Sequence, residues 1–517
     1  MDNGKAGEPT YARLLGPLLQ LVSSSLIERA YLSFRQYQNA LTVGACSLVM
    51  LALVARIAPR LPLEAALSGD SESYITQVPF RPPLYGWVLA IYHWATGSYA
   101  YLPLFQFLLI ALGLLVFSVN LGRLLKSIWV GPLAILLVVL HVYVHEALRQ
   151  ILSESLYLAA ILAGLGLQFR YARRSARGDL VGAAICFALA AATRSTGMAF
   201  LLLPVLTAVL DGRHRFWTAA SRSAQAALAG AAVLIMAMAG NYAKHGHFEI
   251  GSWTGMAILG KGLLVLESSD LPTLPPFVAA IAPEAVRLRD LISAQPNIAD
   301  RMRAQMQASE DLRFALFAPA AEATWPEWQG ADWRARGHLA MKVGQDIIRH
   351  HPLDFLKVGA RDWGSLLLYP MHWPAWASSE PADRLQFPAC RLHDNCWALT
   401  QYDIPAPALV AMLTVSIGGA IGGAILLLTA SLRALRRKAT PTVILFWSMA
   451  LVLHASLLAS GAFESGLVRY TIALHALGVG LLVWFLHLGW RRMRARFPLM
   501  PFISGRRPLA AAGTPNT

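Results

Sequence analysis

Long apolar segments alternate with short polar ones along most of the chain, a pattern typical of a protein that crosses a membrane several times. A helix needs about 20 consecutive apolar residues to cross the hydrocarbon core of a bilayer. Segments close to this length predict about ten transmembrane helices. They lie at residues 40–57, 101–121, 129–144, 151–169, 180–192, 198–210, 224–240, 406–430, 442–460 and 471–490. The pattern therefore predicts an all-α polytopic membrane protein.

Composition and charge agree with this fold class and indicate the orientation of the helices. The chain is 56% hydrophobic and 14% charged, whereas soluble globular proteins carry about 25% charged residues. Its net charge of +15 collects in alternate connections such as RYARRSARGD and RALRRK, and basic connections of this kind stay on the cytoplasmic side. We therefore expect the N-terminal segment 1–39 to be cytoplasmic or interfacial and the basic tail 491–517 to be cytoplasmic. No nucleic acid is expected as a partner.

One long polar region separates the predicted helices within 40–240 from those within 406–490. This region, residues 241–405, is too long for a loop without structure of its own. Helical patterns within it lie at 284–294, 298–317 and 337–368. We therefore expect a mostly helical subdomain on the outer side of the membrane.

The first outer connection, residues 58–100, contains the polar sequence SGDSESYITQVPFRPPLYGW at 68–87. Pro82 and Pro83 end any helix that arrives from the N-terminal side, and they are tolerated in the first turn of a new helix. We therefore expect a helix from 83 to 95 that lies along the membrane surface. Tyr74 and Tyr85 suit the headgroup region, where an aromatic ring with a polar edge is favoured.

Single arginines occur in the outer connections, close to the expected membrane surface. Charges at such positions are costly, so they tend to be paired or functional, and a guanidinium binds a phosphate group through two hydrogen bonds. Together the four arginines would hold phosphate groups. Alternatively, each arginine extends into the headgroup region or pairs with a nearby acid. These arginines are Arg81, Arg149, Arg194 and Arg469.

Acidic residues lie on the same side. Asp70 and Glu72 are in the first outer connection, and GDS is an ordinary turn sequence, so the role of Asp70 is either structural or catalytic. Glu154 is near the outer end of a predicted helix, where water is less available. It would pair with Arg149 or Arg194, or contact a substrate.

Two residue pairs suggest a metal and a disulfide. His145 and Glu146 are adjacent and of types that bind metals, although no third ligand follows at a typical spacing. Cys390 and Cys396 lie in the region expected outside the cytoplasm, where they would form a disulfide; two free thiols are the alternative.

Four stretches together resemble the GT-C class of membrane glycosyltransferases, of the protein mannosyltransferase and aminoarabinose transferase type. The first is the outer loop with an acid, a tyrosine and RPPLY before a surface helix. The others are LSESLYLAAILAGL, AAATRSTGMAFLLLPVL and VRYTIALHAL, so the resemblance covers roughly residues 40–490. The family often has two adjacent acids in the first loop, whereas Ser71 separates Asp70 from Glu72 here.

The resemblance implies a GT-C-like fold and an inverting glycosyltransferase on the periplasmic face of a bacterial inner membrane. Its donor would be a sugar carried by a polyprenyl phosphate, and its acceptor a hydroxyl group of a lipid, glycan or protein. Phosphate leaves without a general acid, so one carboxylate suffices to take the acceptor proton, and Asp70 is the expected base. The resemblance leaves open whether a divalent metal is a cofactor. The residues expected to bind substrate are Glu72, Tyr74, Arg81, Tyr85, Arg149, Glu154, Arg194, Arg469 and Tyr470.

Two other functions fit a polytopic protein with a large outer region. An O-antigen ligase or a polymerase of lipid-linked polysaccharide would place its essential residues in that large region, whereas the conspicuous motif is in the first outer loop. A transporter or flippase for lipid-linked sugars would need charged or broken helices near the middle of the membrane, often in repeated halves. The sequence shows few such charges and no clear repeat.

Overall fold

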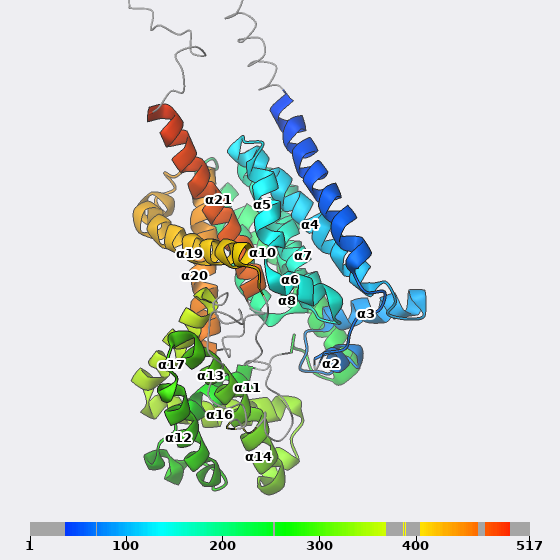
Figure 1. The fold of residues 1–517 in the computed structure, drawn as a ribbon. Coiled ribbons are helices and arrows are strands. Elements are labelled where there is room, and N and C mark those ends of the chain that lie inside the picture. The colour runs from blue at the N-terminus through cyan, green and yellow to red at the C-terminus, as the bar shows by residue number, and fades with distance from the viewer. Residues whose placement is uncertain are drawn as a thin grey trace, which may run out of the picture.

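The computed structural model describes residues 37–68, 70–251, 254–368, 386, 388, 404–463 and 471–496. Within these residues the protein is built from helices, and extended pairing is limited to isolated bridges near the first outer connection. Figure 1 shows two parts, a bundle of long helices and a smaller helical subdomain at one end of it. Their arrangement determines where polar residues meet at the end of the bundle that faces the subdomain, which we call the outer end.

Six helices of the described residues are long and apolar enough to cross a membrane, or seven if one bent pair counts as a single span. The bent pair consists of α5 (Val130–Val139) and α6 (Val142–Arg149), which meet at an angle of 61°. The six helices are Tyr37–Arg60, α4 (Leu102–Leu125), α10 (Phe216–His245), α19 (Ala406–Leu435), α20 (Pro441–Phe463) and α21 (Thr471–Arg496). The chain is therefore a multi-pass membrane protein.

Three of the expected spans correspond to helices that do not reach this length and apolarity on their own. The segment expected at 151–169 is α7 (Glu154–Arg174), and that at 180–192 is α8 (Arg177–Thr193). The segment at 198–210 is divided between the 3-10 helix η2 (Ser195–Leu201) and α9 (Leu202–Leu210). All lie within the bundle, and the count of ten spans stays a prediction.

Helices α4 and α7 pack closely because small residues let their backbones approach. A Cβ atom on Gly113 would lie 2.6 Å from the Ala159 carbonyl oxygen, and one on Gly166 would lie 2.6 Å from the Val116 carbonyl oxygen. Contacts of this kind are a main source of helix association within a bilayer, where burial from water contributes little. The contact fixes the outer start of α7, which carries Glu154.

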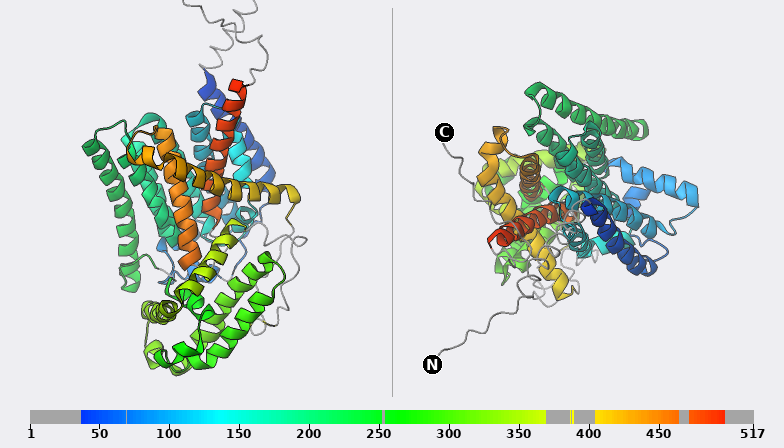
Figure 2. Two further views of the ribbon diagram at one scale, coloured as in Figure 1. Left: turned by 90° about the vertical axis from the view of Figure 1, so that its left-hand side faces the viewer. Right: turned by 90° about the horizontal axis from the view of Figure 1, so that it is seen from above.

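The long helices place the two described ends of the chain on one side of the bundle. The start of Tyr37–Arg60 and the end of α21 both lie at the end of the bundle opposite the subdomain (Figure 1). This agrees with the expectation that both ends share a side. Helix α19 lies across α20 and α21 rather than alongside them, as both Figure 1 and the left view of Figure 2 show.

The outer subdomain has a hydrophobic core of its own, formed by residues such as Leu259, Leu288, Phe317 and Ile347. The helices expected within it are confirmed, and α11 is an addition that the sequence pattern did not predict. The described elements are α11 (Thr254–Leu264), η3 (Ser268–Thr273), α12 (Val278–Ala294), α13 (Ile298–Glu310), the π-helical η4 (Asp311–Phe317), α14 (Ala318–Thr324), α15 (Pro326–Gln329), α16 (Trp333–His350) and α17 (Pro352–Leu367).

A buried ion pair joins the subdomain to the bundle. Lys261 of α11 is fully buried, and its ammonium lies 2.7 Å from the Asp362 carboxylate of α17. The same ammonium donates a hydrogen bond to the Gly461 carbonyl oxygen, near the outer end of α20. Burial raises the pKa of the Asp362 carboxyl, and the charge of Lys261 opposes that rise. One charged pair therefore fixes two subdomain helices to a bundle helix.

Candidate functional site

Backbone hydrogen bonds join the first outer connection to the segment that leads into α7. The Ala66 N–H donates to the Arg149 carbonyl at 2.8 Å, and the Ile151 N–H donates to the Ala66 carbonyl at 3.1 Å. The Ser71 hydroxyl also donates to the Ile151 carbonyl, at 3.0 Å. These bonds bring side chains from about position 70 and about position 154 to one place.

Two short helices shape this connection, α2 (Ser71–Ile75) and α3 (Pro83–Thr96). Helix α3 begins at the expected prolines and ends at Gly97, whose φ of 73° suits glycine because it has no Cβ atom. It projects sideways from the bundle (Figure 1), with Ile91 and Trp94 exposed. The expected helix is confirmed, and its position along a membrane surface stays a prediction.

Asp70 and Arg81 form an ion pair between the start of α2 and the loop before α3. The Arg81 guanidinium also donates to the Ser73 hydroxyl at 3.0 Å and lies over the Tyr74 ring, 4.9 Å from its centre. Both charged side chains are largely buried, with 23% of Asp70 and 15% of Arg81 exposed. The carboxylate of Asp70 is therefore held in one orientation at the outer end of the bundle.

A second ion pair lies deeper, between Glu154 at the start of α7 and Arg194 at the end of α8. Its atoms are 2.6 Å apart, and both side chains are buried. The sequence left two partners open for Glu154, and the structure selects Arg194. Breaking such a pair would leave a buried charge uncompensated, at a cost of about 3–5 kcal/mol.

Two hydroxyl groups connect the two ion pairs. The Tyr74 hydroxyl lies 2.8 Å from the Ser153 hydroxyl. The Ser153 hydroxyl in turn lies 3.3 Å from the Glu154 carboxylate and accepts a hydrogen bond from Arg194 at 3.2 Å. Because the Tyr74 ring also lies beneath the Arg81 guanidinium, these contacts run from Asp70 to Arg194, and we call the whole set the outer network.

Tyr85 supports this network by packing against Tyr74. Its ring meets that of Tyr74 edge to face, with the ring centres 5.2 Å apart, and its hydroxyl donates to Gln106 of α4 at 3.0 Å. Burial raises the pKa of Tyr85 well above its ordinary value, and the charge of Glu154 adds to the increase. Tyr85 is therefore a neutral hydrogen-bond donor that positions Tyr74.

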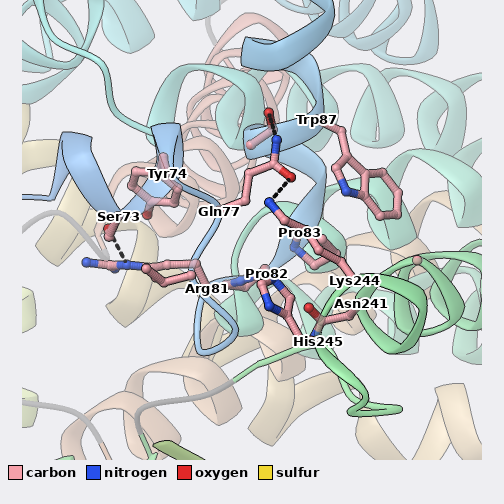
Figure 3. A pocket seen from close by; sticks show the side chains of 13 residues that line it. Ser73, Tyr74, Gln77, Arg81, Pro82, Pro83, Trp87, Asn241, Lys244 and His245 are labelled. Atoms are coloured by element: carbon pink, nitrogen blue, oxygen red, sulfur yellow. Dashed lines mark hydrogen bonds between the residues drawn. The ribbon is translucent and has the colours of Figure 1, made fainter.

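A pocket lies beside the outer network, between the first outer connection and the outer end of α10 (Figure 3). It is about 290 Å³ in volume, part of which is open to solvent. The side chains of Ser73, Tyr74 and Arg81 belong to both the network and the pocket wall. The full lining is Ser73, Tyr74, Gln77, Val78, Arg81, Pro82, Pro83, Gly86, Trp87, Gly240, Asn241, Lys244 and His245.

Gln77 joins the two walls of the pocket. Its side chain donates to the Gly86 carbonyl at 3.2 Å and accepts a hydrogen bond from the Lys244 ammonium at 2.9 Å. Its φ is 54°, a conformation that a residue with a side chain rarely adopts. Strain of this kind is often found where a site must be held in one shape.

Other expected site residues lie apart from this arrangement. Glu72 and Arg149 are exposed, and Arg149 contributes its backbone carbonyl rather than its guanidinium. His145 is hydrogen-bonded to the Val139 carbonyl at 2.8 Å, and the described residues contain no group of three side chains that could hold a metal ion. The remaining calls lie outside the described residues: Arg469, Tyr470, Cys390 and Cys396.

The structure adds residues that the sequence pattern did not mark. Ser153 connects the two ion pairs, and Gln77 and Lys244 close the pocket. Ser153 precedes the acid at the start of α7 in the LSESLY stretch, so that stretch pointed to the right place. Nothing in the sequence pointed to Lys244, because its hydrogen-bond partners Thr76 and Gln77 lie 168 and 167 positions earlier in the chain.

Comparison with known proteins gives no further guide: no family model, no curated protein and no solved structure matches the chain.

Proposed function

We propose that this protein is an inverting glycosyltransferase that moves a sugar from a polyprenyl-phosphate donor to an acceptor hydroxyl, on the periplasmic face of a bacterial inner membrane. The observation that carries the proposal is the outer network. It holds an aspartate and two arginines together beside a pocket, at the end of a membrane-spanning bundle. A carboxylate and fixed cations are the groups that such a transfer needs.

In this proposal Asp70 accepts the proton of the acceptor hydroxyl. The acceptor oxygen then forms a bond to the anomeric carbon as the bond between that carbon and the phosphate oxygen breaks. The lipid phosphate leaves with the electron pair, so no acid has to protonate it. Fixed cations stabilise its charge more strongly in a site that excludes water than they would in solution.

Arg81 has two roles in this scheme. Its ion pair and its bond to Ser73 orient the Asp70 carboxylate. Once Asp70 has taken up the acceptor proton, the charge of Arg81 is no longer matched and stabilises the leaving phosphate. Arg194 lies deeper and is matched by Glu154, so its main role is to hold Ser153 and through it Tyr74. The sugar and the acceptor stay unspecified at this level.

A transfer assay tests the proposal. Purified protein in lipid is given a set of polyprenyl-phosphate sugars, with and without a chelator, and donor consumption is measured. Asp70→Asn is expected to lower consumption by about 10²–10⁴-fold, the usual contribution of a general base. Glu64→Gln is the matched control, because Glu64 is an exposed acid in the same connection.

Near-normal consumption by folded Asp70→Asn would remove Asp70 as the base. If the wild-type protein consumes no donor, the ligase, polymerase and transporter alternatives gain weight. Movement of lipid-linked sugar across proteoliposomes without a new glycosidic product would favour a transporter. Loss of activity with chelator would show that the reaction needs a divalent metal.

A further inference from the structure

Two arginines lie near each other at the end of the bundle opposite the subdomain, which we call the inner end. Arg123 is in the last turn of α4, and Arg173 is in the last turn of α7. The start of the helix Tyr37–Arg60 is at this end of the bundle as well (Figure 1). The inner end is therefore a second place where charged side chains meet membrane-spanning helices.

The packing of α4 against α7 brings the two arginines to the same level. Gly166 of α7 lies against the Val116 carbonyl of α4. Seven residues, about two helical turns, separate Gly166 from Arg173 and also Val116 from Arg123. Because α4 and α7 run in the same direction, the two guanidinium groups follow this contact on the same face.

Nitrogen atoms of both guanidinium groups are enclosed without a partner. The Nε atom of Arg123 and the Nε and Nη2 atoms of Arg173 are buried and have no hydrogen-bond partner among the described residues. A charged donor without a partner is costly to bury, so each case in a native protein needs an explanation, such as a bound ion. The missing partner of an arginine is most simply an anion.

Acids of the protein do not supply this partner. In the described connections of the inner end, the acids are Asp179 and Asp211. The Asp179 carboxylate accepts a hydrogen bond from the Nε atom of Arg170 at 2.6 Å, and the Asp211 carboxylate accepts one from the Nη2 atom of Arg213 at 2.7 Å. Each acid is therefore engaged by another arginine.

The electrostatics around Arg173 also favour a bound anion. Burial lowers the pKa of Arg173 below its ordinary value. The positive charges of Arg174, Arg123 and Arg170 lower this pKa further. The negative charge of Asp179 opposes these effects, but the pKa stays lowered. Like charges are thus held close together here, and an anion between them would relieve their repulsion.

An arginine pair at the end of membrane-spanning helices suits a lipid phosphate. A guanidinium binds phosphate through two parallel hydrogen bonds, and basic sites between transmembrane helices bind anionic lipid headgroups. Both arginines are partly exposed, so a phosphate can reach part of each guanidinium. Its charge would also compensate the enclosed nitrogens, because the positive charge of a guanidinium is delocalised over the whole group.

The neighbouring helix offers a surface for acyl chains. A Cβ atom on Gly122, the residue before Arg123, would lie 2.7 Å from the side-chain methyl group of Thr42, so Tyr37–Arg60 contacts α4 beside the site. Only 17% of the apolar stretch in Tyr37–Arg60 is buried within the protein, and Leu48 is 70% exposed. Free phosphate would not use such a surface, whereas a phospholipid would.

We propose that Arg123 and Arg173 form a binding site for an anionic phospholipid, with its phosphate at the two guanidinium groups and its acyl chains along Tyr37–Arg60. A zwitterionic headgroup carries a cation of its own, so an anionic headgroup is preferred. The bound lipid stabilises the inner contact of α4 and α7, because it neutralises two charges that repel each other. The site shares no residue with the outer network, so this proposal is independent of the proposed function.

Native mass spectrometry of the full-length protein in a neutral detergent tests the site. Phosphatidylglycerol and phosphatidylcholine with the same acyl chains are titrated separately, and the dissociation constant of the first bound lipid is measured. Phosphatidylglycerol is expected to bind at least fivefold more tightly. Inorganic phosphate at the same concentration is expected not to displace it, since phosphate lacks the acyl chains.

The double variant Arg123→Gln/Arg173→Gln is expected to weaken phosphatidylglycerol binding at least fivefold and to leave phosphatidylcholine binding unchanged. Arg123→Lys/Arg173→Lys should have an effect between the two, because lysine keeps the charge but not the paired hydrogen bonds. Arg433→Gln/Arg436→Gln is the matched control, since it removes the same charge from exposed arginines at the end of α19. Phosphatidylglycerol should also raise the thermal denaturation midpoint of the wild type more than that of Arg123→Gln/Arg173→Gln.

Any of four results would overturn the inference. The two lipids bind equally to the wild type, or folded Arg123→Gln/Arg173→Gln binds phosphatidylglycerol as the wild type does. The control variant loses as much affinity as the site variant, which would mean that the net charge of the protein attracts the lipid. Inorganic phosphate displaces the lipid, which would assign the site to a soluble anion. None of these results bears on donor consumption, so the proposed function is tested separately.

Discussion

The outer network and the junction between bundle and subdomain both bury charged side chains, but they do so in different surroundings. At the junction, the Lys261–Asp362 pair is enclosed, and Gln305 donates to the Asp362 carboxylate at 2.7 Å. In the outer network, the Glu154–Arg194 pair is buried as deeply, yet hydroxyl groups connect it to Asp70 and to a pocket. The first arrangement ends at the backbone carbonyl of Gly461, whereas the second ends at a pocket that is partly open to solvent.

The comparison shows that a buried ion pair by itself does not identify a functional site. Desolvation makes each such pair expensive, whatever its role. A pair that only fixes two parts of the fold should affect stability when it is changed. A pair that also positions a reacting group should affect stability and activity together, and this difference can be measured.

The largest effect on stability is expected for Lys261→Met. The Asp362 carboxylate would stay buried without its cation, so the variant should lose about 3–5 kcal/mol of unfolding free energy at neutral pH. Thermal denaturation in detergent measures the loss. Donor consumption per folded molecule should not change. A tenfold fall would mean that the Lys261–Asp362 pair affects activity as well as stability, so the two pairs would not differ in this way.

The loss should become smaller as the pH is lowered. Burial raises the pKa of Asp362 above its ordinary value even with Lys261 present, and removal of the lysine leaves that effect unopposed. A group with a raised pKa in the folded state favours folding when protonated, and this stabilisation is lost as pH rises through the folded-state pKa. The double variant with Lys261→Met and Asp362→Leu should recover most of the stability at neutral pH, since it removes both charges.

A smaller change in stability, but a change in activity as well, is expected for Glu154→Gln. Glutamine keeps an oxygen that accepts a hydrogen bond from Arg194, so the pair is weakened rather than fully broken. The loss should therefore be about 1.5–3 kcal/mol, below the value of about 3–5 kcal/mol for a broken pair. Donor consumption per folded molecule should fall at least tenfold, because Ser153 and Tyr74 lose their fixed positions. Unchanged consumption would mean that the deeper pair serves only the fold.

The smallest effect is expected for Tyr74→Phe. This change removes the hydroxyl that lies 2.8 Å from Ser153 and keeps the ring beneath Arg81. About 1 kcal/mol of stability should be lost, the typical net value of one hydrogen bond. If the hydroxyl connects the two ion pairs functionally, the combined effect of Tyr74→Phe and Glu154→Gln on donor consumption will differ from the sum of their separate effects.

Sequence patterns located several parts of this molecule well. The prolines before residue 84 mark the start of α3, and the helical patterns between 284 and 368 match described helices of the subdomain. Asp70, Tyr74, Arg81, Glu154 and Arg194 were singled out as chemically informative residues, and the structure places all of them in one network. These successes share a cause, since each depends on a local feature such as a helix breaker or a charge beside an apolar segment.

Other features can be identified only from the tertiary structure. Glu72 and Arg149 have the same residue types and similar sequence surroundings as members of the network, yet both are exposed. Lys244 and Gln77 meet across the pocket from distant positions, and the glycine that lets Trp87 lie against α10 is at position 240. Which of several similar residues come together depends on how the helices pack.

The sequence by itself determined that this is a helical, multi-pass membrane protein, because hydropathy and charge act on each segment separately and set its preference for lipid or water. It also singled out five polar residues that meet in the outer network. Only the tertiary structure decided that Glu154 pairs with Arg194, that Ser153 connects this pair to Asp70 through Tyr74, and that Lys244 faces a pocket. Such contacts join residues far apart in the chain, and close packing of the helices selects one set among the many that the sequence permits.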